Sequence, residues 1–193
     1  MRVISGIAKG RKLKAVPGEI TRPITDRTKE ALFNILGTWI IEARVLDLFS
    51  GTGAVGIEAL SRGATHVTFI EKSRAATRII GENLRATGLA DRALVKRIDV
   101  FDFLEQPPPQ PFDLIYIAPP QYKQLWIRTI RMLDPHLDQW LLPDGAVLVQ
   151  IHPVEYEDLA LQNLVLYDER KYGSTLLCFY ERAEAVTTQP DVI

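Results

Sequence analysis

The chain has 193 residues, of which 47% are hydrophobic and 24% are charged, and its formal net charge at pH 7 is −1. These values are ordinary for a globular protein of one domain, and no uncharged apolar run is long enough to predict a transmembrane helix. Arg2 and an apparent strand follow Met1 at once, so we expect no signal segment and a cytoplasmic location. The single cysteine, Cys178, excludes an internal disulfide, and the three histidines lack metal-ligand spacing, so no metal site is expected.

The N-terminal segment is basic. Up to Glu30 the chain carries eight basic and three acidic residues, a net charge of +5 that leaves −6 for the rest. Two short strand-like runs, 2–5 and 11–16, flank a turn from Gly6 to Gly10, which predicts a β-hairpin followed by a loop to residue 24. Such a segment either binds the phosphates of a nucleic acid or is a solvated hairpin, and charge alone does not decide between them. The candidate phosphate contacts here are Lys9, Arg11, Lys12 and Lys14.

A helix is predicted from the capping residue Thr25 to about Leu36, and Gly37 ends it. From Arg44 onward the sequence alternates between strand and helix patterns, which is typical of a parallel, doubly wound α/β sheet. The predicted strands are about 44–49, 66–71, 93–98, 113–118 and 145–151, and the predicted helices fall near 54–61, 73–87 and 123–133.

Two further strands are predicted at 164–168 and 175–181, joined around Tyr172-Gly173. No helix fits between them, so we expect an antiparallel pair at the end of an otherwise parallel sheet. The last residues are polar, and we expect a disordered tail. The chain is therefore predicted to consist of an N-terminal extension, residues 1–24, a domain of residues 25–182, and a tail of residues 183–193.

A glycine-rich turn follows the first strand of the predicted sheet. It reads Gly51-Thr52-Gly53-Ala54-Val55-Gly56, and an apolar helix pattern comes directly after it. Glycines let the backbone turn tightly and approach a ligand closely, while the helix N-terminus offers free N–H groups. This arrangement binds nucleotide-like cofactors, but the G-x-G-x-x-G pattern alone matches dinucleotide sites as well.

Acidic residues mark three consecutive strands near their ends. Asp47 suits a cationic amino group better than a pyrophosphate, which favours S-adenosylmethionine (SAM) over a dinucleotide. Glu71 lies 20 residues after Gly51, where an acid accepts from two ribose hydroxyls, and Asp99 is placed to accept from the adenine amino group. The alternatives are a loop-bracing carboxylate for Asp47 and a solvated helix-opening acid for Glu71. The predicted cofactor site comprises Asp47, Phe49, Gly51, Gly53, Glu71, Lys72, Asp99 and Val100.

The fourth predicted strand ends in Ala118-Pro119-Pro120-Gln121-Tyr122, where two prolines make a rigid corner beside the cofactor cleft. This corner resembles that of amino methyltransferases, in which Asp or Asn precedes two prolines and an aromatic residue. There the acceptor side chain and the carbonyl of the first proline hold the N–H bonds of the target amine and localise its lone pair. The aromatic ring stacks on the base.

Several motifs resemble, in order, those of the bacterial 16S rRNA guanine-N2 methyltransferases. They are the basic hairpin, Arg22-Pro23-Ile24-Thr25-Asp26-Arg27 with Glu30 to Asn34, the Asp47-to-Gly56 motif and Tyr172-Gly173-Ser174-Thr175, which together span about residues 1–181. The resemblance implies a Rossmann-like methyltransferase fold, SAM as cofactor, and a guanine of small-subunit rRNA, or of its assembly intermediate, as substrate. It implies that residues 1–24 are an RNA-binding extension and that the carbonyl of Pro119 accepts a hydrogen bond from the target amine. It places Arg22, Asp26 and Arg27 on the substrate side.

The corner departs from the family pattern at two positions. Ala118 stands where the family has Asp or a similar polar residue, and Gln121 stands where the aromatic residue belongs, with Tyr122 one place later. One interpretation is that the carbonyl of Pro119 with Asp26 or Gln121 supplies the acceptors and Tyr122 stacks on the base. The alternative is a catalytically impaired SAM- and RNA-binding protein that acts in ribosome assembly. No coiled coil or apolar repeat demands a partner, so a monomer is expected.

Overall fold

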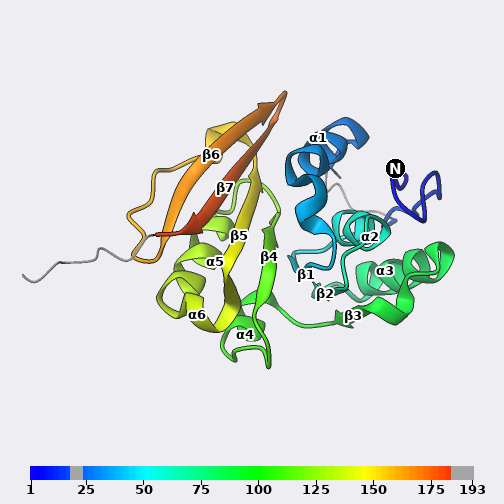
Figure 1. Cartoon of the computed structure of the whole chain (residues 1–193), viewed down its shortest axis with the longest axis horizontal. Coiled ribbons are helices and arrows are strands. Elements are labelled where there is room, and N and C mark those ends of the chain that lie inside the picture. Colours follow the sequence, from blue (N-terminus) through cyan, green and yellow to red (C-terminus); the bar gives the residue numbers. More distant parts are fainter. Residues whose placement is uncertain (18–23, 184–193) are drawn as a thin grey trace, which may run out of the picture.

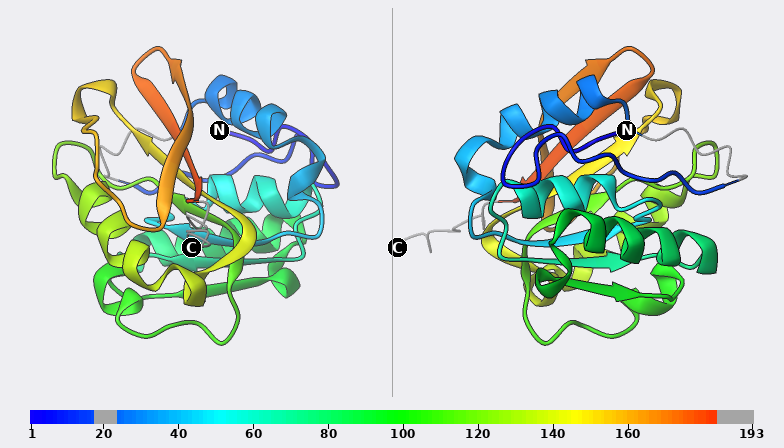
Figure 2. Two further views of the ribbon diagram at one scale, coloured as in Figure 1. Left: turned by 60° about the vertical axis from the view of Figure 1, so that its left-hand side comes forward. Right: turned by 90° about the vertical axis from the view of Figure 1, so that its right-hand side faces the viewer.

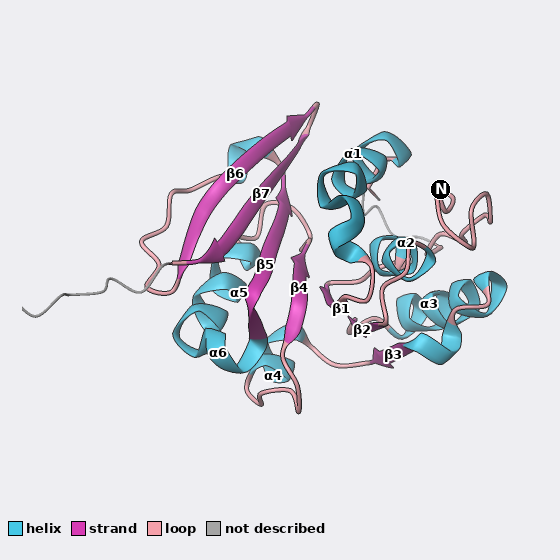
Figure 3. Cartoon of the chain, in the orientation of Figure 1, coloured by secondary structure: helices cyan, strands magenta, loops and turns pink. Residues whose placement is uncertain are grey.

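A seven-stranded sheet with helices on both faces forms the centre of the molecule (Figures 1 and 3). The computed structural model of the chain describes residues 1–17 and 24–183. The strands follow one another across the sheet in the order β3-β2-β1-β4-β5-β7-β6. Their bounds are β1 Arg44–Leu48, β2 His66–Ile70, β3 Ala93–Lys96, β4 Phe112–Ile117, β5 Leu141–Ile151, β6 Leu164–Tyr172 and β7 Thr175–Arg182.

The predicted helices are present, and two short ones are added. α1 begins where Thr25 accepts a hydrogen bond from the backbone N–H of Thr28, at 3.1 Å. α4 and α6 escaped prediction because helices of five and four residues are too short to show a helical period. The α-helices are α1 Asp26–Leu36, α2 Ala54–Ser61, α3 Arg74–Thr87, α4 Val100–Leu104, α5 Leu125–Leu133 and α6 Leu137–Trp140, and the 3-10 helices are Gly37–Ile40, Ala90–Arg92, Asp134–His136 and Pro153–Glu155.

The direction of the strands confirms the predicted sheet. Strands β1 to β5 pair in parallel, whereas β7 runs antiparallel to both β5 and β6. β5 begins at Leu141, four residues earlier than predicted. The sequence from Leu142 to Gly145 reads as a turn, and the structure places it in an irregularity of the register between β4 and β5. Proline and glycine are tolerated at such irregular positions of a strand.

The two faces of the sheet bury separate apolar clusters. One cluster contains Ile57 of α2 and the other contains Trp126 of α5, and Figure 2 shows these helices on opposite sides of the sheet. Side chains alternate along a strand, so Val45 joins the first cluster and Leu46 the second. The same alternation points Asp47 toward α2, the helix that follows the glycine-rich turn.

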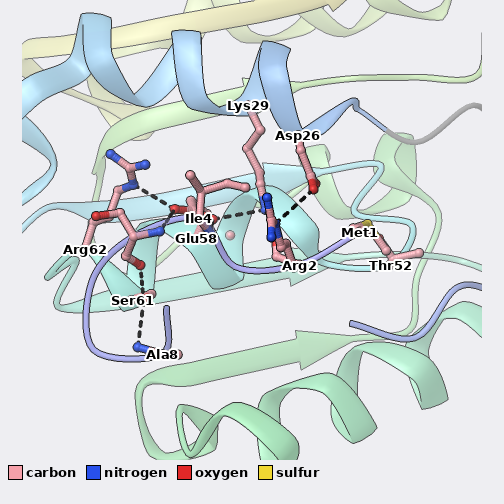
Figure 4. A network of polar contacts seen from close by, with 12 residues as sticks. Met1, Arg2, Ile4, Ala8, Asp26, Lys29, Thr52, Glu58, Ser61 and Arg62 are labelled. Atoms are coloured by element: carbon pink, nitrogen blue, oxygen red, sulfur yellow. Dashed lines mark hydrogen bonds and ion pairs between the residues drawn. The ribbon is translucent and has the colours of Figure 1, made fainter. Parts of the chain in front are cut away.

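The predicted N-terminal β-hairpin is not confirmed. Residues 1–17 form no strand, although an antiparallel bridge between Arg2 and Lys12 and three backbone hydrogen bonds, from Val3 to Arg11, Gly10 to Val3 and Leu13 to Met1, join the two arms of this segment. Beyond Val3 the first arm bonds to α2 instead of to the second arm (Figure 4). The backbone N–H groups of Ile4 and Ser5 donate to the carboxylate of Glu58 at 2.8 and 2.9 Å. Backbone donors that a buried side chain already satisfies are not available for a strand ladder.

Some predictions fall on residues outside the described ranges. Arg22 and residues 184–193 are among them, so the role of Arg22, the tail and the boundary at residue 24 stay predictions. Within residues 1–17 and 24–183, no helix has the length and apolar character needed to cross a bilayer. The same residues contain no group of three or more His, Cys, Asp or Glu side chains able to hold a metal ion.

Candidate active site

A cleft of about 1160 Å³ opens at the carboxyl ends of β1, β2, β4 and β5, and the start of α1 and the turn between β6 and β7 supply further walls. Parallel strands end at the same edge of a sheet, so residues far apart in the sequence meet there. The volume exceeds the roughly 1000 Å³ at the upper end of small-molecule pockets, which leaves room for a cofactor and a base together. The sequence-predicted residues that line the cleft are Arg27, Asp47, Phe49, Gly51, Glu71, Lys72, Asp99, Val100, Ala118, Pro119, Gln121 and Tyr122.

The glycine-rich turn lines the cleft with Gly51, Thr52, Ala54 and Val55. Gly51 lines it with a φ of 54°, and a Cβ added there would meet no heavy atom within 4 Å. Gly53 is not among the lining residues. Its φ of 75° lets it serve as the N-cap of α2, and a Cβ there would come within 3.3 Å of the side chain of Ile80. Gly51 thus provides space for a ligand, while Gly53 provides the turn.

Asp47 is a buried carboxylate with an incomplete set of hydrogen bonds. It is 1% exposed, and its Oδ2 accepts from the N–H of Gly56 at 3.3 Å. Among the described residues its Oδ1 has no hydrogen-bond partner. Burial raises the pKa of Asp47 to about 8, the Gly56 bond opposes this, and the charge of Glu71 adds to it. The carboxylate therefore braces α2 and also leaves one oxygen for a donor, and a cationic amino group satisfies both that oxygen and the charge.

Glu71 and Asp99 are both held in place by backbone N–H groups. Glu71 accepts from Gly51 at 2.9 Å and from Ser73 at 2.8 Å, so its two oxygens are fixed at the edge of the cleft. Each carboxylate oxygen retains a further lone pair for a ligand hydroxyl. Asp99 caps α4 and lies 3.5 Å from the Nζ of Lys72. The predicted acids thus form a rigid row of acceptors along the ends of β1, β2 and β3.

The corner that follows β4 lines the cleft with all five of its residues, Ala118 to Tyr122. Tyr122 is 67% exposed and has a φ of 63°, which is unusual for a bulky residue. Its backbone N–H donates to Glu155 at 2.7 Å, and its ring centroid lies 5.8 Å from that of His152. Both contacts come from the segment after β5. They hold the aromatic ring at the exposed part of the cleft, where a base can stack on it.

Asp26 does not take the position that the sequence suggested for a second acceptor. Its carboxylate lies 3.5 Å from the Nε of Arg2, and it is not among the residues that line the cleft (Figure 4). Its neighbour Arg27 does line it. A helix turns by about 100° per residue, so adjacent side chains of α1 face different ways. Arg27 faces the cleft and Asp26 faces the N-terminal segment.

The lining residues that sequence reasoning missed include Tyr116 of β4 and Gln150 of β5. The hydroxyl of Tyr116 donates to Oε1 of Gln150 at 2.7 Å. Each is a polar residue near the carboxyl end of a predicted parallel strand, as Asp47 is. A polar residue near the carboxyl end of a buried strand is the sequence pattern from which both residues could have been predicted.

The basic residues of the N-terminal segment differ in their surroundings. Lys9, Arg11 and Lys12 are exposed. Lys14 is also exposed, but its Nζ pairs with Glu82 at 2.8 Å and holds the pKa of that carboxyl below its usual value. Among the described residues, the first three have no ion-pair partner, whereas Lys14 is partly engaged within the protein.

The strand order with its reversed β7, together with the acids at the ends of β1 and β2, defines the class of SAM-dependent methyltransferases. Comparisons agree with this class. Over 182 residues the chain is 35% identical to ribosomal RNA small subunit methyltransferase D of Escherichia coli K12, covering 94% of this chain and 90% of that one. It is 37% identical over 185 residues to a candidate rRNA methyltransferase of Bacillus subtilis, YlbH, covering 94% and 99%.

Residues 1–181 match the model of a family described as conserved hypothetical protein 95. A solved structure of the candidate methyltransferase yhhF from E. coli superposes with a TM-score of 0.80 at 37% identity, covering 94% of this chain and 97% of that one. The chain belongs to this family, and its resemblance to the small-subunit rRNA methyltransferases is confirmed.

Proposed function

We propose that this protein is a SAM-dependent methyltransferase that methylates the exocyclic N2 of a guanine in small-subunit rRNA. One observation carries the proposal. The row of acids and the Pro119-Pro120 corner, which are distant in sequence, line one cleft. The part of the cleft lined by the acids suits a cofactor, and the part lined by the Pro119-Pro120 corner suits an amine on a planar base. The E. coli relative is named ribosomal RNA small subunit methyltransferase D, and this name supports the choice of small-subunit rRNA as substrate.

The cofactor is held by three carboxylates. Asp47 receives the amino group, Glu71 the ribose hydroxyls, and Asp99 with the adjacent Val100 the adenine. Bound SAM supplies a methyl group on a positively charged sulfur. The buried unpaired oxygen of Asp47 and the open space at Gly51 both fit such a ligand. A cation beside Asp47 favours its ionised form and so lowers its pKa from about 8.

The Pro119-Pro120 corner positions the target base. The reaction needs no covalent intermediate between enzyme and base. The carbonyl of Pro119 accepts an N–H of the target amine, and Tyr122 stacks on the ring. Cys178, the single cysteine, is fully buried in β7, and burial raises the pKa of its thiol to about 12. Such a thiol is a poor nucleophile. Direct transfer between aligned donor and amine therefore accounts for the chemistry. The alternative of an impaired binding protein is not favoured, because the relatives are named as methyltransferases.

The proposal is tested on small ribosomal subunits isolated from cells that lack this gene. Incubation with the purified protein and SAM is expected to yield N2-methylguanosine, detected by mass spectrometry of the nucleosides. Matched subunits from cells that retain the gene are expected to accept far less methyl, because the site is already modified. Methyl transfer to a different base, or none at all by a protein that binds SAM, contradicts the proposed activity.

The exposed cations of the N-terminal segment are expected to bind rRNA phosphates. Changing Lys9, Arg11 and Lys12 together to Gln should lower the slope of log affinity against log salt by about two, since each phosphate contact contributes roughly 0.7–0.9. SAM affinity, measured by calorimetry, should not change. The control is Arg131→Gln, an exposed residue of α5 on the opposite face of the sheet. An unchanged salt slope in the triple variant means that the segment is only a solvated surface.

A further inference from the structure

Four side chains cluster on one face of the sheet at the inner end of the cleft. Asp47 of β1 is paired in register with Tyr116 of β4. Ala118 and Gln150 follow directly after Ile117 and Val149, the last registered pair of β4 and β5. Tyr116, Ala118 and Leu148 belong to the same apolar cluster, so the alternation along β5 puts Gln150 on that face too. Ala118 and Gln150 are therefore neighbours across adjacent strands.

The amide of Gln150 is oriented by a buried phenol. Tyr116 is 3% exposed, and burial followed by the charge of Asp47 raises its pKa well above 10. A phenol that keeps its proton donates, so the atom that receives its bond at 2.7 Å is the amide oxygen of Gln150. That oxygen has a second lone pair, and the amide nitrogen beside it carries two N–H groups. Gln150 itself is half-buried and lines the cleft.

We propose that Gln150, oriented by Tyr116, is the side-chain acceptor for the target amine that Ala118 cannot supply. The inference rests on the proposed function and names a further catalytic residue for it. The oxygen of the amide accepts one N–H of the guanine 2-amino group, while the amide N–H₂ is placed to donate to the adjacent ring nitrogen N3. The carbonyl of Pro119 accepts the other N–H. This pairing reads the 2-amino edge of guanine, which adenine does not present.

The other candidate acceptors are less suited. Asp26 pairs with Arg2 outside the cleft. Gln121 is exposed and follows both prolines, whereas Gln150 is half-buried and fixed by a hydrogen bond. A preorganised acceptor stabilises a transition state without reorganising during the reaction, and an exposed, mobile one does not.

The step balances without a further reactant. The lone pair of N2 forms the new N–C bond while the C–S bond breaks and its electron pair goes to sulfur, which becomes a neutral thioether. The methylated nitrogen then releases one proton to water. Gln150 takes no proton, because its part is to hold one N–H so that the lone pair points at the methyl group.

The test compares Gln150→Leu, which lacks the acceptor, with Gln150→Glu, which retains one. In single-turnover assays on subunits from cells that lack the gene, Gln150→Leu is expected to transfer methyl about 10²–10³-fold more slowly, the usual cost of one preorganised contact. SAM affinity should stay within about twofold. The transfer rate of Gln150→Glu should fall much less, and adding Ala118→Asn to Gln150→Leu should raise the rate of that variant at least tenfold. The control is Gln139→Leu, an exposed residue of α6, which should match the natural protein.

A second readout does not depend on turnover. With S-adenosylhomocysteine bound, guanosine and inosine are titrated and followed by NMR, since inosine differs only in lacking the 2-amino group. The natural protein is expected to prefer guanosine, and Gln150→Leu is expected to lose that preference. Wild-type rates in Gln150→Leu, or an unchanged preference, overturn the role of Gln150 while leaving the proposed function intact. An inactive natural protein overturns the proposed function, and the nucleoside preference then still decides whether Gln150 contacts the amine.

Discussion

Replacing Glu58 by Ala is expected to lower the free energy of unfolding by about 3–5 kcal/mol, because removing one partner of a buried ion pair leaves the other charge uncompensated. Glu58 and Lys29 are both fully buried, with Nζ 3.0 Å from the carboxylate, and Arg62 pairs with the same group at 2.8 Å. The backbone N–H groups of Ile4 and Ser5 lose their acceptor as well. Figure 4 shows Lys29 of α1 and Ile4 of the N-terminal segment approaching Glu58 of α2, with Arg62 at the end of the same helix.

Urea unfolding of the natural protein and of Glu58→Ala measures this loss of stability. The matched control is Glu82→Ala, whose carboxylate also pairs with two cations, Lys14 and Arg78, but at the surface. Solvent screens those pairs, so the control should unfold close to the natural protein. A double change of Lys29→Met with Glu58→Leu should recover part of the loss, because it removes the unpaired charge. A stability of Glu58→Ala equal to that of the control would mean that the buried pair does not hold the fold.

The second large effect is expected at Asp47. Asp47→Asn should weaken SAM binding by about 2–5 kcal/mol, the usual range when one partner of a buried charge pair is lost. This corresponds to a loss of affinity between about thirtyfold and a few thousandfold. Asn preserves the shape of the side chain and an acceptor for Gly56, so the loss reports the charge. Calorimetry with SAM measures it, and Asp102→Asn, an exposed acid of α4, is the control. Equal affinities in the two variants would remove Asp47 from the cofactor site.

The same residue is expected to make stability depend on pH. In the folded protein without SAM the pKa of Asp47 is about 8, against an ordinary value of 3.8. Between these values the folded state holds a proton that the unfolded chain has released, so stability is lost as pH rises from about 4 to 8. The loss should be on the order of a few kcal/mol, and Asp47→Asn, which does not titrate, should lack it. Urea unfolding at pH 5 and pH 8 checks this, and parallel pH profiles of the two proteins would contradict it.

Much of the cofactor half of the site was predictable from local patterns. Apolar runs separated by helical periods specify parallel strands, and parallel strands bring their carboxyl ends to one edge. Asp47, Glu71 and Asp99 therefore had to meet once the strands were recognised. The capping residue Thr25 and the reversed β7 follow from equally local signals, a hydroxyl before a helix and a loop too short for a crossover.

What only the tertiary structure decided concerns groups whose partners are distant in the sequence. Two strand-like runs around the turn from Gly6 to Gly10 predicted a hairpin, but Glu58, more than 50 residues away, takes the backbone donors of Ile4 and Ser5. Tyr116 and Gln150 are 34 positions apart, and only the register of β4 against β5 places them in contact beside Ala118. Local patterns specify which elements form. A buried polar group, however, is satisfied by whichever partner packing brings within reach, and packing depends on the whole fold.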